Sequence, residues 1–125
     1  MNPSVWKLVV GKEYTHIQYT LCNYAARKLK NRAYPGLIHA ENSNTSGIIY
    51  KNIDEKDIVK LDEFEGQEYQ RIELFEMDGI KVHTYLYTST LENLLLEEWD
   101  YTHFIENEFE DFISVFGGWD RIRNP

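Results

Sequence analysis

A glutamate at a junction between a helix and a strand is the strongest candidate for chemistry in this sequence. The segment Leu61–Arg71 (LDEFEGQEYQR) closes a predicted helix and opens a predicted strand, and it places Glu65 where the chain turns. Ile58, Leu61 and Glu65 stand at i, i+3 and i+7, so they share one face of that helix. The apolar face therefore ends in a carboxylate, which is a defect, a partner for a buried cation or a catalytic group.

Several side chains in neighbouring segments are candidates to surround Glu65. They are Tyr34, Tyr69, Arg71, Tyr85 and Tyr87. An apolar wall, here Phe64 and the tyrosines, would raise the pKa of the carboxylate and make it a better base. The alternative interpretation is structural: Glu65 supports the fold by accepting backbone hydrogen bonds or by pairing with Arg71.

The helix that must carry Glu65 has clear start and stop signals. Asp54 is a good N-cap residue, and Glu55 and Asp57 place negative charge in the first turn, where the helix dipole favours it. Gly66 follows, and glycine commonly ends a helix. These signals predict that the helix begins after Asp54 and ends beside the next strand.

Periodicity and turn residues predict the remaining elements. Before the central helix they predict a helix over Pro3–Val10, strand over Glu13–Leu29, a turn at Tyr34–Leu37, a strand over Leu37–Ala40, a polar loop over Glu41–Ser46 and a strand over Gly47–Lys51. After it they predict strands over Glu68–Met77 and Ile80–Thr88 around an Asp78-Gly79 turn, a partly helical connector over Ser89–Glu98 and a helix over Tyr101–Phe116. An apolar stripe of that last helix is expected in the core: Ile105, Phe109, Phe112 and Phe116.

This order of elements predicts an α+β fold. Strands and helices do not alternate regularly, so the sheet is expected to be mixed and mostly antiparallel, curled into a small β-barrel flanked by helices. A chain of 125 residues is normally one domain. We therefore expect a single domain over residues 1–125.

Composition argues against several classes of function. The net charge of −8 argues against nucleic-acid partners and against an anionic membrane. Cys22 is the only cysteine, which excludes an internal disulfide, fits a reducing compartment and is expected to pack in the core. No segment approaches the roughly 18 apolar residues of a membrane span, and the N-terminus lacks a signal peptide pattern. We expect a soluble, cytoplasmic protein.

The motifs of other catalytic sites are absent from the sequence. It contains no Gly-rich phosphate loop and no Gly-x-Ser-x-Gly elbow. The four histidines are scattered singly, without an i, i+4 pair that would suit a metal ion. We therefore expect neither a metal nor a cofactor.

Two motifs together resemble the gamma-glutamylcyclotransferase-like family, which includes the gamma-glutamylamine cyclotransferases and the plant avirulence-induced proteins. They are the turn Tyr34-Pro35-Gly36-Leu37 and the segment Leu61-Asp62-x-Phe64-Glu65-Gly66-x-x-Tyr69-x-Arg71. The strand with Tyr87 and the segment Trp99-Asp100-Tyr101 with the final helix also resemble the family. The likeness covers nearly the whole chain. It implies a small mixed β-barrel with an acidic residue in a cavity.

The resemblance also implies a reaction and a set of site residues. The catalytic glutamate of the family corresponds to Glu65, and the residues implied to bind substrate are Tyr34, Gly36, Leu37 and Tyr87. The implied reaction converts a small gamma-glutamyl amine or peptide into 5-oxoproline and a free amine. The α-amino group of the substrate attacks its own γ-carbonyl, and one carboxylate can take the proton and return it to the leaving amine.

One segment of the family pattern does not occur in this sequence. The family usually begins with a strand ending in Tyr-Gly-Thr/Ser-Leu, whose backbone cradles the glutamyl part of the substrate; we expect this chain to start just after it. Two functions therefore stand: the enzyme, and a non-catalytic ligand-binding or interaction protein that kept the fold. An open barrel exposes unpaired strand edges, so we expect a homodimer, the tail Trp119–Pro125 or a rearranged helix to cover them.

Overall fold

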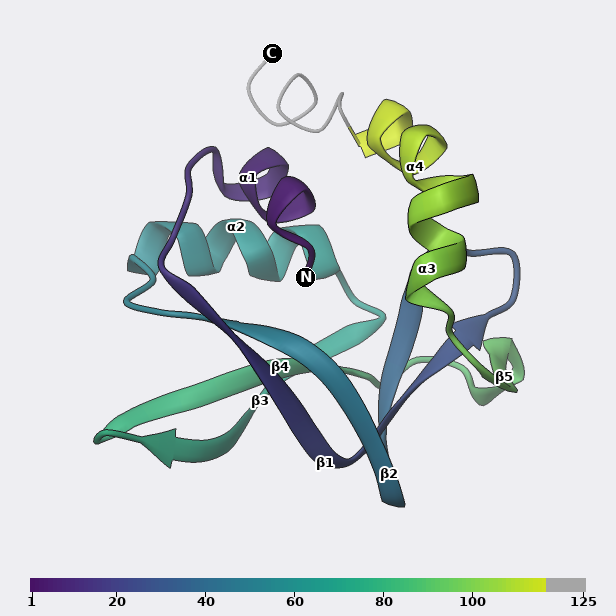
Figure 1. Ribbon diagram of the computed structural model, residues 1–125, viewed down its shortest axis with the longest axis horizontal. Helices are drawn as coiled ribbons and strands as arrows, with labels where there is room; N and C mark the ends of the chain where they lie inside the picture. The colour runs from purple at the N-terminus through teal and green to yellow at the C-terminus, as the bar shows by residue number, and fades with distance from the viewer. Residues whose placement is uncertain (117–125) are drawn as a thin grey trace.

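The fold consists of helices packed against two antiparallel sheets (Figure 1). A computed structural model describes residues 1–116 of the chain. The elements, in chain order, are α1 (Pro3–Val10), β1 (His16–Leu29), β2 (Pro35–Tyr50), α2 (Glu55–Glu65), β3 (Tyr69–Met77), β4 (Ile80–Tyr87), β5 (Leu94–Glu98), α3 (Tyr101–His103) and α4 (Phe109–Phe116). The α+β class expected from the sequence is confirmed.

The first sheet is built on one long hairpin of β1 and β2. Their register runs from His16 opposite Tyr50 to Lys28 opposite Pro35, with a bulge after Cys22. The polar segment Glu41–Ser46, expected to be a loop, lies inside β2, so that prediction is wrong. Residues 44–46 of this segment pair with β1, and at the bulge the Asn42 N–H donates to the Asn23 side chain instead, so backbone partners are found whatever the polarity of the side chains. Cys22 is exposed rather than packed in the core.

The segment expected to be a partly helical connector provides a third strand instead. A short 3₁₀ turn at Leu91–Asn93 leads into β5, which pairs with β1 through Leu29 opposite Leu94 and Arg27 opposite Glu98. The expected helical character is limited to that turn. The pairing partner of β5 lies more than sixty residues earlier in the chain, which explains why local sequence did not reveal the strand.

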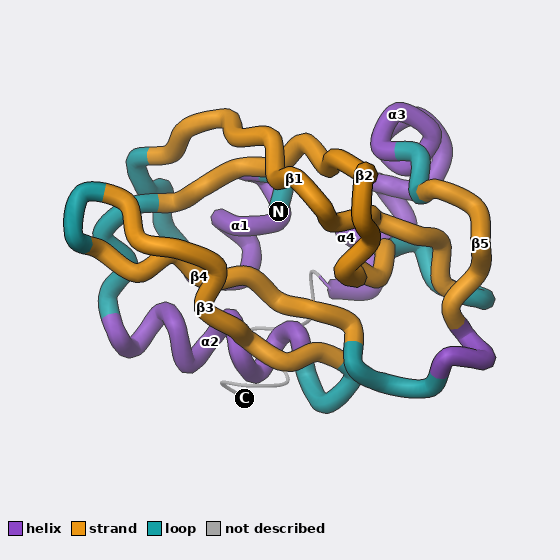
Figure 2. Tube along the Cα trace, turned by 90° about the horizontal axis from the view of Figure 1, so that it is seen from below, coloured by secondary structure: helices purple, strands orange, loops and turns teal. Residues whose placement is uncertain are grey.

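The second sheet is the predicted hairpin of β3 and β4. Asp78 and Gly79 connect the strands with positive φ angles of 51° and 77°, as a tight hairpin turn requires. Tyr69 lies opposite Tyr87, and Arg71 lies opposite Tyr85. Figure 2 shows α2 running alongside this pair of strands.

The strands do not close into a barrel, so this part of the expected fold is wrong. Within residues 1–116 they form one sheet in the order β2-β1-β5 and a separate β3–β4 pair. β2 and β4 lie close together, but no ladder of hydrogen bonds joins them. A closed barrel needs every strand to be paired on both sides, whereas β1 alone among the described strands has two neighbours.

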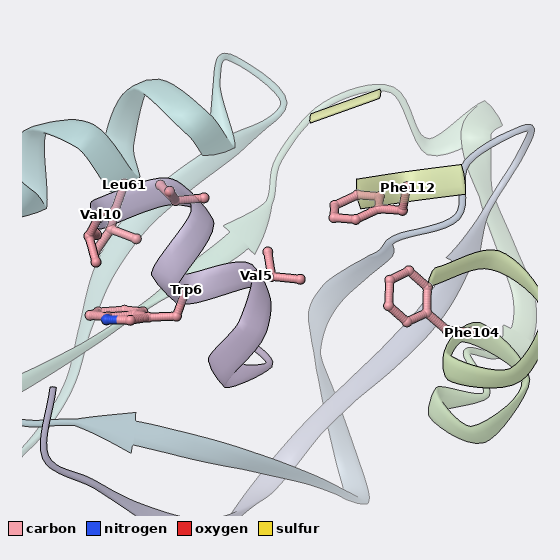
Figure 3. Close-up of a cluster of buried hydrophobic side chains, with 7 residues drawn as sticks. Val5, Trp6, Val10, Leu61, Phe104 and Phe112 are labelled. Carbon is pink, nitrogen blue, oxygen red and sulfur yellow. The ribbon is translucent and has the colours of Figure 1, made fainter. Parts of the chain in front are cut away.

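The hydrophobic core lies between α1, α2 and the C-terminal helix (Figure 3). Asn2 caps α1 by accepting a hydrogen bond from the Ser4 N–H at 2.7 Å, which confirms the start predicted from Asn2-Pro3. The buried members of the core are Val5, Trp6, Val9, Val10, Leu61, Phe104 and Phe112. α1 therefore contributes four of the seven, which makes it the centre of the core.

A π turn changes the buried face of the C-terminal helix. The helix starts as α3, continues as a π turn over Phe104–Glu108 and ends as α4. Phe104 is 5% exposed, whereas Ile105 is 39% exposed, so the expected stripe is wrong at Ile105. Phe109 and Phe112 pack on the core as expected, and the Phe116 side chain lies outside the described part of the chain.

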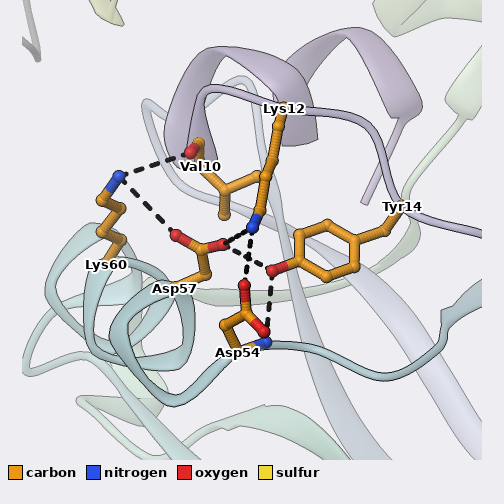
Figure 4. A network of polar contacts seen from close by, with 6 residues as sticks. All are labelled: Val10, Lys12, Tyr14, Asp54, Asp57 and Lys60. Atoms are coloured by element: carbon orange, nitrogen blue, oxygen red, sulfur yellow. Dashed lines mark hydrogen bonds and ion pairs between the residues drawn. The ribbon is translucent and has the colours of Figure 1, made fainter.

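A buried carboxylate ties the end of α1 to the start of α2 (Figure 4). Asp57 is 1% exposed and accepts a hydrogen bond from the Tyr14 hydroxyl at 2.5 Å. Lys12 and Lys60 place their Nζ atoms 3.4 and 3.6 Å from its oxygens. Burial acts to raise the pKa of Asp57, but Tyr14 and the lysines lower it overall. The Asp54 side chain, expected to cap α2, pairs with Lys12 at 2.6 Å instead.

Candidate functional site

The last turn of α2 carries two carboxylates toward the β3–β4 pair. Glu65 is the final residue of the helix, and Asp62 stands one turn earlier. Gly66 ends the helix with a φ of 74°, a conformation that favours glycine, and its N–H donates to the Asp62 carbonyl at 3.1 Å. The turn therefore points the chain directly into β3.

Four side chains on one face of the β3–β4 pair lie beneath this turn. Tyr69 and Arg71 are two residues apart on β3, and Tyr87 and Tyr85 lie opposite them on β4. Alternate residues of a strand share a face, so the four form a block of three phenols and one guanidinium. The rings of Tyr69 and Tyr87 pack edge to face at 5.7 Å between centroids.

Asp62 connects α2 to half of that block. Its Oδ1 accepts a hydrogen bond from Arg71 Nε at 3.0 Å and another from the Tyr85 hydroxyl at 2.5 Å. A charged acceptor with two donors makes stronger hydrogen bonds than a neutral pair does. These two contacts fix the end of the helix on the sheet.

Glu65 is partly buried in a region that is rich in phenols. Burial raises the pKa of Glu65 to about 7; the amino group of Met1 opposes this shift, and the charge of Asp62 adds to it. Burial also raises the pKa of Tyr69, and the negative charge of Glu65 contributes to that shift. Burial and then Asp62 raise the pKa of Tyr85, with a smaller contribution from Glu65. The negative charge of Glu65 therefore acts on both phenols.

The turn between β1 and β2 lies against the other half of the block. The Tyr69 hydroxyl donates to the Pro35 carbonyl at 2.6 Å. A side-chain carbon added to Gly36 would lie 3.1 Å from Cβ and Cγ of Tyr87, so the backbone of β2 touches the Tyr87 side chain here. The Tyr34 ring lies 6.4 Å from that of Tyr69, and its hydroxyl donates to Glu68 at 3.4 Å.

A match to a protein-family model identifies the family of this chain. The family described as "Gamma-glutamyl cyclotransferase, AIG2-like" matches residues 1–103. The chain belongs to this family. The resemblance seen in the sequence is therefore confirmed.

Plant proteins are among the relatives of this AIG2-like chain. AIG2-like protein C of Arabidopsis thaliana is 27% identical over 119 residues, which cover 91% of this chain and 69% of the relative. AIG2-like protein B of the same plant is 26% identical, with 99% of this chain and 76% of the relative covered.

Two solution structures of Arabidopsis thaliana proteins share the fold of this chain. One has a TM-score of 0.64 at 21% identity and covers 99% of this chain and 87% of the other. The second has a TM-score of 0.60 at 22% identity, with coverage of 100% and 79%. These similarities concern the fold alone.

The structure brings together most of the site residues predicted from the AIG2-like motifs. Tyr34, Gly36 and Tyr87 lie around Tyr69, and the negative charge of Glu65 contributes to the raised pKa of Tyr69. Leu37 is partly buried within β2, opposite Ala26. Its role as a substrate-binding residue stays a prediction, as do the roles of the other residues.

The structural interpretation of Glu65 expected it to pair with Arg71, but Arg71 pairs with another residue. Its guanidinium pairs with Asp62, and none of the hydrogen bonds or ion pairs found within residues 1–116 involves the Glu65 carboxylate. No role for Asp62 was predicted from the sequence. Its position one helical turn before Glu65, within the segment Leu61–Arg71, could have indicated that it lies near Glu65.

The expected cavity at Glu65 stays a prediction, because the pockets identified lie elsewhere. One of ≈ 110 Å³ is lined by residues that include Arg32, Trp99 and His103, and another of ≈ 140 Å³ lies along residues 105–111. Residues 1–116 contain no group of three or more His, Cys, Asp or Glu side chains arranged to hold a metal ion. In the same part of the chain, no helix has the length and apolar character to cross a membrane.

Proposed function

We propose that the protein is a gamma-glutamyl cyclotransferase that converts a small gamma-glutamyl amine or peptide into 5-oxoproline and a free amine. Glu65 is its general acid and base. The observation that carries this proposal is the position of Glu65 at the last turn of α2, which Asp62 ties to Arg71 and Tyr85 of the β3–β4 pair. Burial at this position raises the pKa of Glu65 to about 7. A carboxylate with such a pKa accepts and returns a proton near neutral pH, as this reaction requires. Membership of the family supports the same reaction.

The reaction needs one bond to form and one to break. The α-amino nitrogen of the substrate bonds to its own γ-carbonyl carbon, and the bond from that carbon to the leaving amine breaks. Glu65 takes the proton that the α-ammonium group must lose before attack, and it returns a proton to the leaving nitrogen. Nucleophile and electrophile share one molecule, so holding that molecule folded supplies much of the acceleration.

The surrounding residues suit the binding of the gamma-glutamyl part. Burial keeps the pKa of Glu65 raised, and the negative charge of Glu65 acts on the neighbouring phenols of Tyr69 and Tyr85. Tyr34, Gly36 and Tyr87 lie on the side where β1 turns into β2, and with Leu37 we assign them to substrate binding.

The direct test measures release of 5-oxoproline from a panel of gamma-glutamyl amines and dipeptides. Glu65→Gln keeps the shape of the side chain and removes the base, so we expect kcat to fall by about 100-fold or more. Glu55→Gln is the matched control, because Glu55 is an exposed carboxylate at the opposite end of α2. Full turnover by the Glu65→Gln protein would remove Glu65 from the mechanism.

The second candidate is a binding protein on the same fold, and the tyrosine hydroxyls favour it. Tyr69, Tyr85 and Tyr87 donate their protons to the Pro35 carbonyl, to Asp62 and to the Thr90 carbonyl, respectively. None of these three phenols is therefore free to stabilise the oxyanion that attack on the γ-carbonyl creates. Calorimetry that detects binding of a gamma-glutamyl compound, without any release of 5-oxoproline, would select this second function.

A further inference from the structure

Asp62 occupies a position from which it can control Glu65. It stands one turn before Glu65 on α2, and both of its described side-chain contacts come from the β3–β4 pair. Arg71 Nε and the Tyr85 hydroxyl share the same oxygen, Oδ1. The Asp62 carbonyl also accepts the Gly66 N–H, which closes the helix immediately after Glu65.

This arrangement fixes Asp62 from two directions. The side chain is tied to the sheet, and the backbone is tied to the turn that ends the helix. Glu65 lies between these two attachments in the chain, so the orientation of its carboxylate depends on both. The side chains of Asp62 and Arg71 are 43% and 36% exposed, so water partly screens the field of the pair.

We propose that Asp62 is a positioning residue that acts through Glu65: held by Arg71 and Tyr85, it fixes the last turn of α2 and sets the electrostatic field at the Glu65 carboxylate. The proposal rests on the function assigned to Glu65 above and adds the residue that adjusts its acid–base chemistry. Asp62 itself touches no reacting atom. Its effect reaches the substrate only through the carboxylate one turn away.

Four groups on the surrounding elements interact electrostatically with the Glu65 carboxylate. Asp62 contributes a negative charge from α2, and the Met1 amino group contributes a positive one from the segment before α1. Tyr69 and Tyr85 contribute phenols from β3 and β4. Among these four groups, Asp62 carries a negative charge that its ion pair with Arg71 partly neutralises.

The pair of charges allows two substitutions with opposite expected effects. Asp62→Asn removes the negative charge and leaves the Arg71 guanidinium without its partner, so ionisation of Glu65 becomes easier. The midpoint of the Glu65 titration is expected to fall by about half a pH unit or more. Arg71→Gln leaves the Asp62 charge without its partner, so the midpoint is expected to rise. Both side chains are more than one-third exposed, and we therefore expect both variants to fold.

The test follows the Glu65 carboxyl carbon by NMR as a function of pH in protein labelled with [13C]glutamate. Its signal is identified as the one that disappears in Glu65→Gln. Glu55→Gln is the control, since it removes one negative charge at the far end of α2 and should not move the midpoint. The acid limb of the kcat/KM profile for a gamma-glutamyl substrate should move in the same directions as the NMR midpoints.

The outcomes separate this proposal from the proposed function. A protein without turnover contradicts the cyclotransferase function, whereas the NMR midpoints decide the role of Asp62 without any substrate. An unchanged midpoint in folded Asp62→Asn overturns the proposal. Shifts of the same sign in Asp62→Asn and Arg71→Gln also overturn it, because a field set by these two opposite charges requires shifts of opposite sign.

Discussion

At the scale of single residues, the surroundings of Glu65 disfavour the charged form of its carboxyl group. Burial raises its pKa from the ordinary value of 4.5 to about 7. A group with a raised acid pKa binds a proton more tightly in the folded state than in the unfolded state. The folded protein therefore loses stability as the pH rises from about 4.5 through 7, and the loss is complete above 7. Stability lost at a functional residue in this way is common where chemistry needs an unusual pKa.

Removing the charge should recover that stability. Glu65→Gln is expected to be more stable than the wild type at pH 8 by about 2 kcal/mol, with the difference vanishing near pH 4.5. Chemical denaturation of both proteins across this pH range measures the effect. A constant difference at all pH values would show that Glu65 ionises as freely in the folded state as in the unfolded state.

At the scale of the elements, the contact between β2 and β4 positions the aromatic side of the site. Gly36 is buried at the start of β2, and the Tyr87 side chain fills the space where a larger residue would lie. A carbon added to Gly36 would also lie 3.2 Å from Cδ2 of Leu29. Because neighbours approach from two directions, the position has little room to relax.

Enlarging this glycine is expected to disturb both the fold and the site. Gly36→Ala should lower the free energy of unfolding by about 1–2 kcal/mol and weaken substrate binding by displacing Tyr87. Gly47→Ala is the matched control on the same strand, since a carbon added there meets nothing within 4 Å. Thermal unfolding of the two variants gives the comparison; equal losses of stability would mean that crowding at Gly36 is not the cause.

At the scale of the whole molecule, the two separate sheets have edges that no other strand within residues 1–116 pairs with. β5 forms one edge of the larger sheet, and its Leu96 is 87% exposed. Leu91, in the turn before β5, is 78% exposed. Such edges and apolar side chains are commonly covered by another chain. The tail Trp119–Pro125, expected as one possible cover, lies outside the described residues.

We propose that a symmetric homodimer covers these edges, because one self-complementary patch then protects both copies. Sedimentation velocity at low micromolar concentration should give a dimer. Leu96→Glu should shift the equilibrium toward monomer, whereas Val59→Glu, at a 51% exposed position on α2, should leave it unchanged. A wild-type protein that sediments as a monomer would contradict the proposal.

The elements with local signals could be predicted from the sequence. Asn2 and Pro3 mark the start of α1, and Gly66 marks the end of α2. Asp78 and Gly79 mark the hairpin between β3 and β4. Each of these signals acts through the conformation of one or two residues or through a hydrogen bond to a near neighbour. The family motifs around Glu65 and Tyr87 could also be recognised, because the residues of each motif lie close together in the sequence.

Tertiary structure decided the features that depend on distant partners. The polar segment Glu41–Ser46 lies within a strand because β1 pairs with residues 44–46 and with the residues before the segment, and Leu94–Glu98 is a strand because it pairs with the other end of β1. The pKa of Glu65 and the contacts of Asp62 arise where α2 packs against β3 and β4. Burial, hydrogen-bond partners and nearby charges set these properties, and all three depend on which distant segments the fold brings together.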